Sequence, residues 1–155
     1  ESIEKIGYKA YTKVIDVTAI EANKYLASKL QVEIGDPIVH LKRIRMINDV
    51  PMSLENSFLN KLLINNIEFE KDYLENKSLY RLLREQANIE FSYAEEKIHA
   101  VLCDAETAEL LKISKDEPIL FIKRKTYIKD NVPIEYCENY VRSDVYNIVI
   151  RFNKE

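Results

Sequence analysis

Residues 38–59 read IVHLKRIRMINDVPMSLENSFL, and residues 119–141 read ILFIKRKTYIKDNVPIEYCENYV, a second version of the same pattern. A proline stands directly before each version, at Pro37 and at Pro118, and each version contains a Lys-Arg pair, a polar turn, a further proline and a Glu-Asn pair. The alternation of apolar and polar residues around the turn predicts a β-hairpin in each version. Two similar hairpins in one short chain indicate a pseudo-symmetric sheet.

The register of the first hairpin follows from the position of its turn. With the turn at residues 48–50, Arg43 lies opposite Glu55. Alignment of the two versions matches Arg43 with Arg124 and Glu55 with Glu138, so we expect Arg124 to lie opposite Glu138. Exposed opposite charges stabilise paired strands by less than ~1 kcal/mol, so stability alone gives a weak reason for these pairs.

A strand and a helix are predicted before the first hairpin. Residues 11–17 are rich in β-branched residues and predict a short strand. Thr18 and Glu21 have the spacing of a capping box, which predicts a helix from there to about Lys29. Gly35 and the residues that follow it end the helix and begin the hairpin.

The second half of the chain repeats this order after one additional helix. That helix is expected over residues 78–86, with Ser78 or Asn76 as its N-cap and Asn88 as its stop. Residues 89–103 alternate as an extended strand, and Asp104 is expected to cap the next helix. The order βαββ-α-βαββ predicts an α+β fold, an antiparallel sheet with pseudo-repeated helix-hairpin units and helices packed on it.

Length and composition limit the possible classes of protein. The 155 residues, 46% of them hydrophobic, suffice for one domain with its own core. The net charge of −3 and the absence of a basic motif argue against a general nucleic-acid surface. No apolar run has the roughly 18 residues of a membrane span and no secretory signal opens the chain, so a cytoplasmic location is expected. Because the chain begins at Glu1 without a Met, we expect a fragment or a processed product.

Cysteines and histidines give no sign of a metal site, a cofactor or a catalytic centre. Cys103 and Cys137 have no C-x-x-C spacing, so reduced core cysteines are favoured over a disulfide between them. His40 and His99 have no metal-ligand partner at a useful spacing and are interpreted as structural residues. No glycine-rich phosphate loop and no nucleophile motif is present.

Three features could bind a ligand. Arg43 and Arg45 direct two guanidinium groups to one side of a strand and suit phosphate or carboxylate oxygens, although a solvated face with an ion pair to Glu55 is the alternative. Ser78 opens a helix whose free amides could complete an anion site, or it is an ordinary N-cap. Glu138, Tyr140 and Arg142 share one face of the last strand and could bind sugar hydroxyls or form a structural network.

Taken together, these stretches resemble the UTRA domain, the effector-binding half of the HutC-like GntR repressors. The resemblance covers nearly the whole chain from about Tyr11, and no single motif in it is decisive. The matching motifs are Gly35-Asp-Pro37, Arg43-Ile-Arg45, Asp49-Val-Pro51, Leu54-Glu-Asn-Ser57, Ser78-Leu-Tyr80, Arg124-Lys-Thr-Tyr127, Pro133-Ile-Glu135 and Glu138-Asn-Tyr-Val-Arg142.

The resemblance implies a domain layout. It implies a chorismate-lyase-like fold, residues 1–10 as a lead-in segment from an interdomain linker, and residues 11–155 as the effector-binding domain. The winged helix-turn-helix domain that binds operator DNA in this family is absent from the chain, and dimerisation through the effector domain is implied.

The resemblance also implies site residues. In members that sense sugar phosphates, the matching positions assign Arg43, Arg45, Ser78 and Tyr80 to the phosphate. The resemblance also implies that Glu55 and Glu138 bind the sugar hydroxyls and that Tyr140 lines the pocket. The second hairpin departs from the pattern because Lys125-Thr126 gives no second Arg-x-Arg, which fits a single asymmetric site.

The expected function is therefore an effector-sensing domain of a bacterial repressor, not an enzyme. It would bind a small anionic metabolite, such as a sugar phosphate, and shift a dimer between its operator-binding and released arrangements. Two alternatives remain open. One is an enzyme on the related chorismate-lyase scaffold, because fold kinship does not fix function. The other is a dimerisation module that binds no ligand.

Overall fold

The computed structural model describes residues 9–75, 77–145 and 147–155. The expected lead-in, residues 1–10, lies outside the described part except for Lys9 and Ala10. Among the described residues, no helix has the length and apolar character that crossing a bilayer requires.

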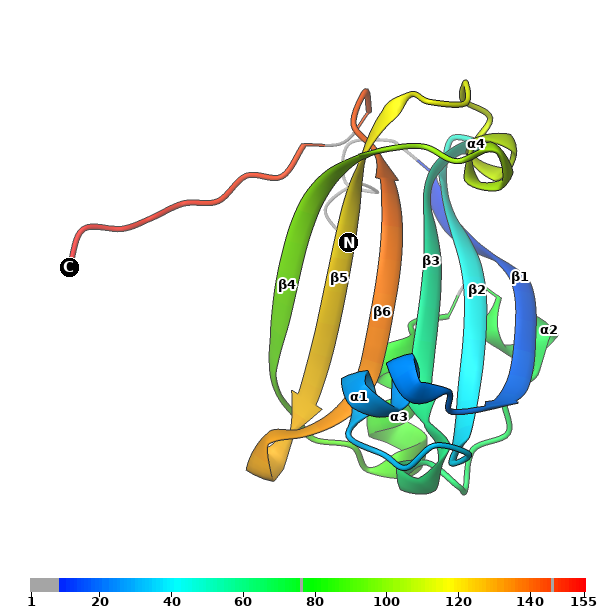
Figure 1. Cartoon of the computed structure of the whole chain (residues 1–155), viewed down its shortest axis with the longest axis vertical. Coiled ribbons are helices and arrows are strands. Elements are labelled where there is room, and N and C mark those ends of the chain that lie inside the picture. Colours follow the sequence, from blue (N-terminus) through cyan, green and yellow to red (C-terminus); the bar gives the residue numbers. More distant parts are fainter. Residues whose placement is uncertain (1–8, 76, 146) are drawn as a thin grey trace.

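Within the residues that the structure describes, six antiparallel strands form one sheet in the order β1-β2-β3-β6-β5-β4, with β1 and β4 at its two edges (Figure 1). The sheet confirms the predicted pseudo-symmetry, because each half is a strand, a helix and a hairpin, and the two halves meet where β3 pairs with β6. The strands are β1 (Ala10–Glu21), β2 (Pro37–Ile47), β3 (Val50–Asn60), β4 (Phe91–Leu102), β5 (Pro118–Ile128) and β6 (Val132–Arg142).

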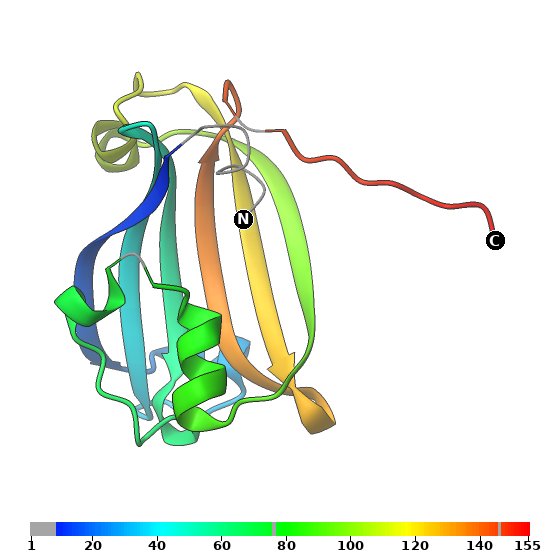
Figure 2. The same ribbon diagram turned by 180° about the vertical axis from the view of Figure 1, so that it is seen from behind.

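Helices cover both faces of the sheet. One face, here the α1/α4 face, carries α1 (Lys24–Leu30) near one end and α4 (Ala105–Leu111) near the other (Figure 1). The opposite face, here the α2/α3 face, carries α2 (Lys71–Leu74) and α3 (Leu79–Ala87) (Figure 2). In the described part of the chain, the short 3-10 turns η2 (Lys61–Leu63) and η3 (Lys129–Asn131) follow β3 and β5. This is the predicted α+β architecture, with helices packed on an antiparallel sheet.

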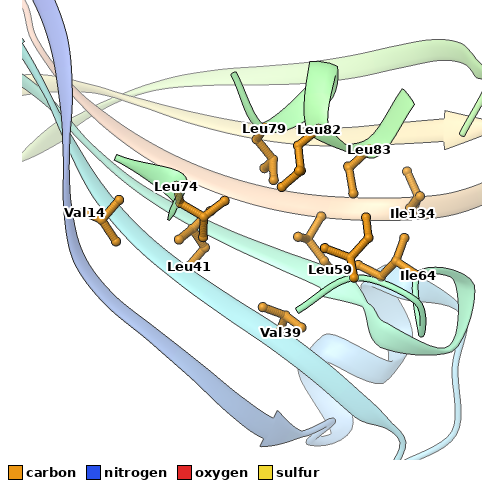
Figure 3. Close-up of a cluster of buried hydrophobic side chains, with 11 residues drawn as sticks. Val14, Val39, Leu41, Leu59, Ile64, Leu74, Leu79, Leu82, Leu83 and Ile134 are labelled. Atoms are coloured by element: carbon orange, nitrogen blue, oxygen red, sulfur yellow. The ribbon is translucent and has the colours of Figure 1, made fainter. Parts of the chain in front are cut away.

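The main core lies under α2 and α3. Buried side chains of α3 meet buried side chains of β2 and β3, as Figure 3 shows for Leu79, Leu83, Leu41 and Leu59. The strands supply these contacts at every second position, as the pleat requires. Because this packing fixes α3 against the sheet, it also fixes the position of side chains that α3 directs along the sheet surface.

The two hairpin turns differ in length, and this difference decides which residues share a face. In the first turn, Asn48 and Asp49 have φ values of 49° and 63°, as in the two-residue turns that match strand twist. The turn predicted at residues 48–50 is therefore one residue too long, but a register shift between Arg45 and Met46 restores the predicted pairing of Arg43 with Glu55. The second turn contains η3 and is one residue longer.

The predicted register of the second hairpin is wrong by one residue, because it required two more residues between the paired positions than in the first hairpin and the longer turn adds only one. Arg124 lies opposite Cys137, and Glu138 lies opposite Lys123. A one-residue slip reverses every side chain, so Glu138 lies on the α1/α4 face instead of the face of Arg124.

Helix starts were predicted with mixed success. Ser78 and Asp104 are the N-caps of α3 and α4, and Asn88 ends α3 in the left-handed conformation, as expected. The capping box at Thr18 is wrong, because β1 continues to Glu21 and pairs there with β2. Asn23 caps α1 instead, with its Oδ1 accepting from the Leu26 amide at 2.8 Å.

Candidate functional site

The α2/α3 face carries a buried arginine paired with a carboxylate. Arg43 Nη2 donates to Glu55 Oε2 at 2.8 Å across β2 and β3. The arginine side chain is 9% exposed and the glutamate 32%, so the pair has one buried and one accessible member. A guanidinium has five N–H donors, and this ion pair uses only part of that capacity.

Three buried polar atoms on this face have no hydrogen-bond partner among the described residues, namely Arg43 Nε and Asn139 Oδ1 beside the ion pair and Ser57 Oγ further along β3. Asn139 lies directly opposite Glu55, so the two side chains emerge on the same face. Unpaired buried polar groups are rare because each loses its bonds to water without replacement. The unpaired donor of Arg43 and the unpaired acceptor of Asn139 lie on either side of Glu55, and together these groups could bind a polar ligand.

A second carboxylate, Glu135, lies on the same face further along β6 and is 1% exposed. Tyr80 reaches over it from α3, donating its hydroxyl proton to Glu135 Oε1 at 2.5 Å. Thr126 on β5 lies 3.0 Å from the Tyr80 oxygen and 3.4 Å from Glu135 Oε1. Burial, the largest cause, raises the pKa of Glu135, while the bond from Tyr80 lowers it. Burial and the nearby Glu135 charge raise the pKa of Tyr80, so its hydroxyl remains a donor.

Glu55 and Glu135 are linked through the residues between them. Cys137 donates from Sγ to Glu55 Oε1 at 3.6 Å, and burial followed by the charges of Glu55 and Glu135 raises the pKa of this thiol well above its usual value. The thiol therefore stays protonated. Together the two carboxylates and the intervening groups form a polar band across β3 and β6 under the edge of α3.

A small cavity adjoins this band at the α3 end of β4 and β5. Its volume is about 170 Å³, and it is lined by Tyr80, Arg84, Phe91, Ser92, Tyr93, Ala94, Arg124 and Thr126. Arg124 lies with its guanidinium carbon 5.4 Å from the centre of the Tyr80 ring. The cavity thus brings further positive charge next to the Tyr80–Glu135 pair.

The other predicted residues on this face are accessible. Arg45 lies two positions after Arg43 on β2, opposite Ser53, and is exposed. Ser78 is exposed at the start of α3, where its Oγ accepts from the Arg81 amide at 3.3 Å. The structure therefore joins Arg43 to Glu55, places Arg45 on the same face, and joins Tyr80 to Glu135.

Glu138 and Tyr140 are not brought together with the other predicted site residues. Both lie on the α1/α4 face, where Tyr140 stacks on Phe121 with ring centres 4.6 Å apart. Glu138 pairs with Lys123 in the register of β5 and β6. The sheet itself separates these two side chains from Arg43 and Glu55.

Glu135 and Asn139 are the site residues that sequence reasoning missed. Counting from the three-residue second turn alone would set Arg124 opposite Tyr136, and it is a register shift between Thr126 and Tyr127 that puts Glu135, Cys137 and Asn139 on the face of Glu55, a feature that the sequence pattern does not signal. Among the described residues, no group of three or more His, Cys, Asp or Glu side chains is arranged to hold a metal ion. The cysteines are both free and buried, so the preference for reduced thiols is confirmed.

Comparison with known proteins places these features in a family context. The family model described as UTRA domain matches residues 5–147. The HTH-type transcriptional repressor NagR of Bacillus subtilis is 28% identical over 149 residues, which are 96% of this chain and 60% of that protein. The mannosyl-D-glycerate transport/metabolism system repressor MngR of Escherichia coli is 27% identical over 140 residues, 90% of this chain and 57% of that protein.

The fold has a close counterpart among solved structures. The crystal structure of the effector domain of PhnF from Mycobacterium smegmatis superposes with a TM-score of 0.88, covering 99% of this chain and 93% of that chain at 24% identity. At that identity the likeness concerns the fold. The chain spans about 57–60% of the length of the two curated relatives. Both curated relatives are named as transcriptional repressors, and the match to the family model confirms the predicted resemblance to the UTRA domain.

Proposed function

The chain belongs to the UTRA domain family, and from that premise we propose that it is the effector-sensing domain of a GntR-type transcriptional repressor of the HutC-like subfamily. Its effector is a small anionic sugar derivative, such as a sugar phosphate. The ligand binds on the α2/α3 face and changes the affinity of a full-length dimer for operator DNA. The DNA-binding winged helix-turn-helix belongs to the remainder of a longer cytoplasmic protein.

The observation that carries this proposal is the pair of unpartnered buried atoms, Arg43 Nε and Asn139 Oδ1, on either side of Glu55. A ligand that presents an anionic oxygen to Arg43 and a hydroxyl to Asn139 would satisfy both atoms. Hydrogen bonds that involve a charged partner contribute about 1.5–3 kcal/mol each. Binding of such a ligand would therefore be favoured, because it gives hydrogen bonds to two buried atoms that have none in the free domain.

Each side chain has a distinct role in this proposal. Arg43 and the exposed Arg45 contact the anionic group, and the free amides at Ser78 add donors from the start of α3. Glu55 and Glu135 accept from sugar hydroxyls. Tyr80 orients Glu135 and closes the pocket towards α3.

Two further considerations support an anionic sugar as the ligand class. A cationic pair next to two carboxylates suits a molecule with an acidic group at one end and hydroxyls along its length. The name of MngR refers to mannosyl-D-glycerate, a glycoside that carries a carboxylate. This relative is 27% identical over 90% of the present chain, which supports related ligand chemistry.

Regulation requires the ligand to favour one arrangement of the dimer over another. A ligand with equal affinity for the operator-binding and released arrangements would shift nothing. Coupling free energies in regulated proteins are typically about 1–3 kcal/mol, and we expect this range here. The α2/α3 face is suited to this coupling because its ligand would contact both halves of the sheet, through Glu55 and through Glu135.

The experiment that tests the proposal is thermal unfolding of the chain with a panel of sugars and their 6-phosphates at fixed ionic strength. A ligand at about 100 times its dissociation constant adds roughly 2.7 kcal/mol of stability. For a domain of this size this corresponds to a shift of roughly 5–10 °C in Tm. Arg45→Ala should clearly reduce the shift at the same ligand concentration, whereas Arg81→Ala, a matched change of an exposed arginine on α3, should preserve it.

The outcomes separate the competing hypotheses. Stabilisation by a phosphorylated sugar but not by its neutral form supports the anion site. Stabilisation by a neutral sugar alone would move the ligand class away from phosphates and remove the role given to Arg43 and Arg45. If no compound shifts the melt, the dimerisation-module hypothesis replaces the present one.

A further inference from the structure

The cavity beside Tyr80 has two arginine side chains in its lining, Arg84 from α3 and Arg124 from β5. The guanidinium carbon of Arg84 lies 5.3 Å from the centre of the Phe91 ring, and that of Arg124 lies 5.4 Å from the centre of the Tyr80 ring. The two rings are neighbours, with their centres 4.9 Å apart. Two positive charges are therefore held against adjacent rings in the wall of one cavity.

Arg84 has unused hydrogen-bonding capacity. Its neighbour on α3, Arg81, donates from Nε to Glu85 at 2.8 Å, one helical turn further along. The residue one turn after Arg84 is Asn88, and no hydrogen bond or ion pair joins Arg84 to another residue in the described part of the chain. A guanidinium over a ring keeps its N–H donors free, because they lie in its own plane. Arg84 can therefore donate to a group inside the cavity.

Arg124 is only weakly paired. Its Nη1 lies 3.4 Å from Glu96 Oε1, and the two side chains are 38% and 43% exposed. Its Nε donates to Thr126 Oγ1 at 3.3 Å. A long ion pair between two accessible side chains contributes little to stability. An acidic group in the cavity could therefore replace Glu96 at little cost.

The cavity has a size and a lining that suit an acidic group. Its volume is about 170 Å³, whereas one molecule of liquid water occupies about 30 Å³. One carboxylate or phosphate group therefore fits. The hydroxyls of Ser92 and Thr126 add neutral hydrogen-bonding groups to the lining, and none of the described residues that line the cavity is Asp or Glu.

Charges along the α2/α3 face follow the order of the strands. β2 supplies Arg43, β3 Glu55, β6 Glu135 and β5 Arg124, and these four strands are consecutive in the sheet. Positive side chains thus lie at both ends of the polar band, with two carboxyl groups between them. Neighbouring strands are about 4.8 Å apart, so three spacings separate the backbones of the two arginines by about 14 Å. This row complements a molecule with an acidic group at each end and hydroxyls between them.

We propose that the effector carries two acidic groups at opposite ends of a hydroxylated chain or ring, and that Arg84 and Arg124 bind the second one. This inference rests on the proposed function, in which Arg43 and Arg45 contact the first acidic group. The ligand class is that of sugar acids which also carry a phosphate, or of acidic glycosides with a second acidic group. Arg84 and Arg124 are then specificity-determining residues, because they favour such a molecule over a sugar phosphate whose other end is neutral.

Nuclear magnetic resonance tests whether the cavity binds an anion. The Nε–Hε signals of the arginines are followed in an isotope-labelled chain during a titration with inorganic phosphate at fixed ionic strength. Slightly acidic pH slows the exchange of these protons with water, and variants that each replace one arginine by glutamine assign the signals. We expect saturable shifts at Arg84 and Arg124 and none at Arg151, an exposed arginine outside the sheet. The Arg43 signal reports on the first acid site in the same spectra.

The same titration separates this inference from the proposed function. Shifts at Arg43 alone would overturn the second acid site and leave the proposed effector site standing. Shifts at Arg84 and Arg124 alone would overturn the anion site of the proposed function, and with it a ligand that spans both. Equal shifts at all arginines, Arg151 included, would show a general effect of the salt and overturn the second site.

A comparison of matched ligands tests the two-ended effector directly. Each sugar 6-phosphate of the panel is compared by titration calorimetry with the aldonic acid 6-phosphate of the same carbon skeleton, for example glucose 6-phosphate with 6-phosphogluconate. We expect the dissociation constant of the acid to be at least tenfold lower. Arg84→Gln and Arg124→Gln should each reduce this preference to less than threefold. Arg81→Gln, which removes the same charge from the exposed side of α3, should preserve it.

The contradicting results of this comparison are also distinct. Equal affinity within every pair that binds would overturn the second acid site, while the sugar phosphate of the proposed function would remain. A preference that persists in both Arg84→Gln and Arg124→Gln would place the second acidic group elsewhere and overturn the role of the cavity. Failure of both members of every pair to bind would overturn the ligand class of the proposed function and this inference together.

Discussion

Arg43 and Glu55 lie directly opposite each other on β2 and β3, with Nη2 and Oε2 2.8 Å apart, and Arg43 Nε beside them has no partner among the described residues. The arginine is thus held in place by one carboxylate while part of its donor capacity is unused. A purely structural ion pair would leave a solvated arginine or a fully bonded one. The unpaired donor of the Arg43 guanidinium is therefore available to hydrogen-bond a ligand.

Arg45→Ala is expected to separate binding from stability. Because Arg45 is exposed, its removal should change the free energy of unfolding by no more than about 0.5 kcal/mol. Loss of a charge-assisted bond to a phosphate should weaken ligand binding by about 1.5–3 kcal/mol. Titration calorimetry with the sugar phosphate found by the melting panel measures the second quantity and urea unfolding the first. Equal affinity in the wild type and the variant would remove Arg45 from the site.

Arg43→Ala is expected to affect both properties. Its side chain is buried and its loss leaves Glu55 without its partner, so we expect the domain to lose about 1–3 kcal/mol of stability. The double variant Arg43→Ala with Glu55→Gln should lose less than the sum of the single changes, since the ion pair is removed only once. Urea unfolding of the four proteins checks this. Strict additivity would mean that the pair does not couple in solution.

Glu135→Gln should stabilise the domain increasingly as the pH rises. Burial raises the pKa of Glu135, so the folded state holds a proton that the unfolded state releases above its usual pKa of about 4.3. The contribution of the protonated carboxyl is complete below that pH and declines as the pH rises towards the folded-state pKa. The wild type should therefore approach Glu135→Gln in stability near pH 4 and fall behind it near pH 7. Thermal unfolding across this range provides the comparison, and a constant difference would contradict the raised pKa.

Asp104→Ala tests the helix cap of α4. Asp104 Oδ1 accepts from the Thr107 amide at 2.8 Å, and this bond is the main cause of its lowered pKa. We expect a loss of about 0.5–2 kcal/mol at neutral pH. A lowered pKa gives stability that is full above the unfolded-state value of about 3.9 and disappears as the pH falls through the folded-state value. The loss measured by urea unfolding should therefore be smaller at pH 3 than at pH 7, whereas Ser53→Ala should show no such trend.

The two thiols should react only after unfolding. Cys103 and Cys137 are buried and free, and burial raises the pKa of both thiols, so little thiolate is present to attack a reagent. A thiol-specific chromogenic reagent should release little colour from the native chain at neutral pH and should titrate both cysteines in urea. Rapid labelling of the native chain would show that one of the thiols is accessible.

The sheet could be predicted from sequence because its signals are local. The alternation in residues 38–59 and 119–141, the prolines before them and the capping residues Ser78 and Asp104 all act over a few positions, and the structure confirms them. The capping box at Thr18 failed because the same residues also fit a strand. Pairing of Thr18 with His40 on β2 is a long-range contact that local spacing does not reveal.

The candidate site was predicted only in part, for a related reason. Arg43 and Glu55 come from one hairpin, and counting from a turn at residues 48–50 predicts their pairing correctly because a register shift between Arg45 and Met46 compensates for the shorter observed turn. Glu138 was assigned to the face of Arg124 because alignment of the two Glu-Asn pairs implies two more residues between the paired positions of the second hairpin than of the first. The second turn adds only one, so Cys137 lies opposite Arg124 and Glu135 shares its face. Turn lengths and register shifts are the quantities that the sequence comparison left undetermined.

The junction between the two halves of the sheet has a mechanical consequence. β3 and β6 pair only from Ser53 to Leu59, a shorter ladder than those within either hairpin, and it is the only strand pairing that joins the halves in the described part of the chain. A ladder with fewer cross-links is the more compliant one, so shear between the halves should concentrate there. A molecule held by Glu55 on one side and Glu135 on the other would act as a brace across this joint. Ligand binding would then change the stiffness of the sheet as well as its shape, and either change could alter the rest of the protein.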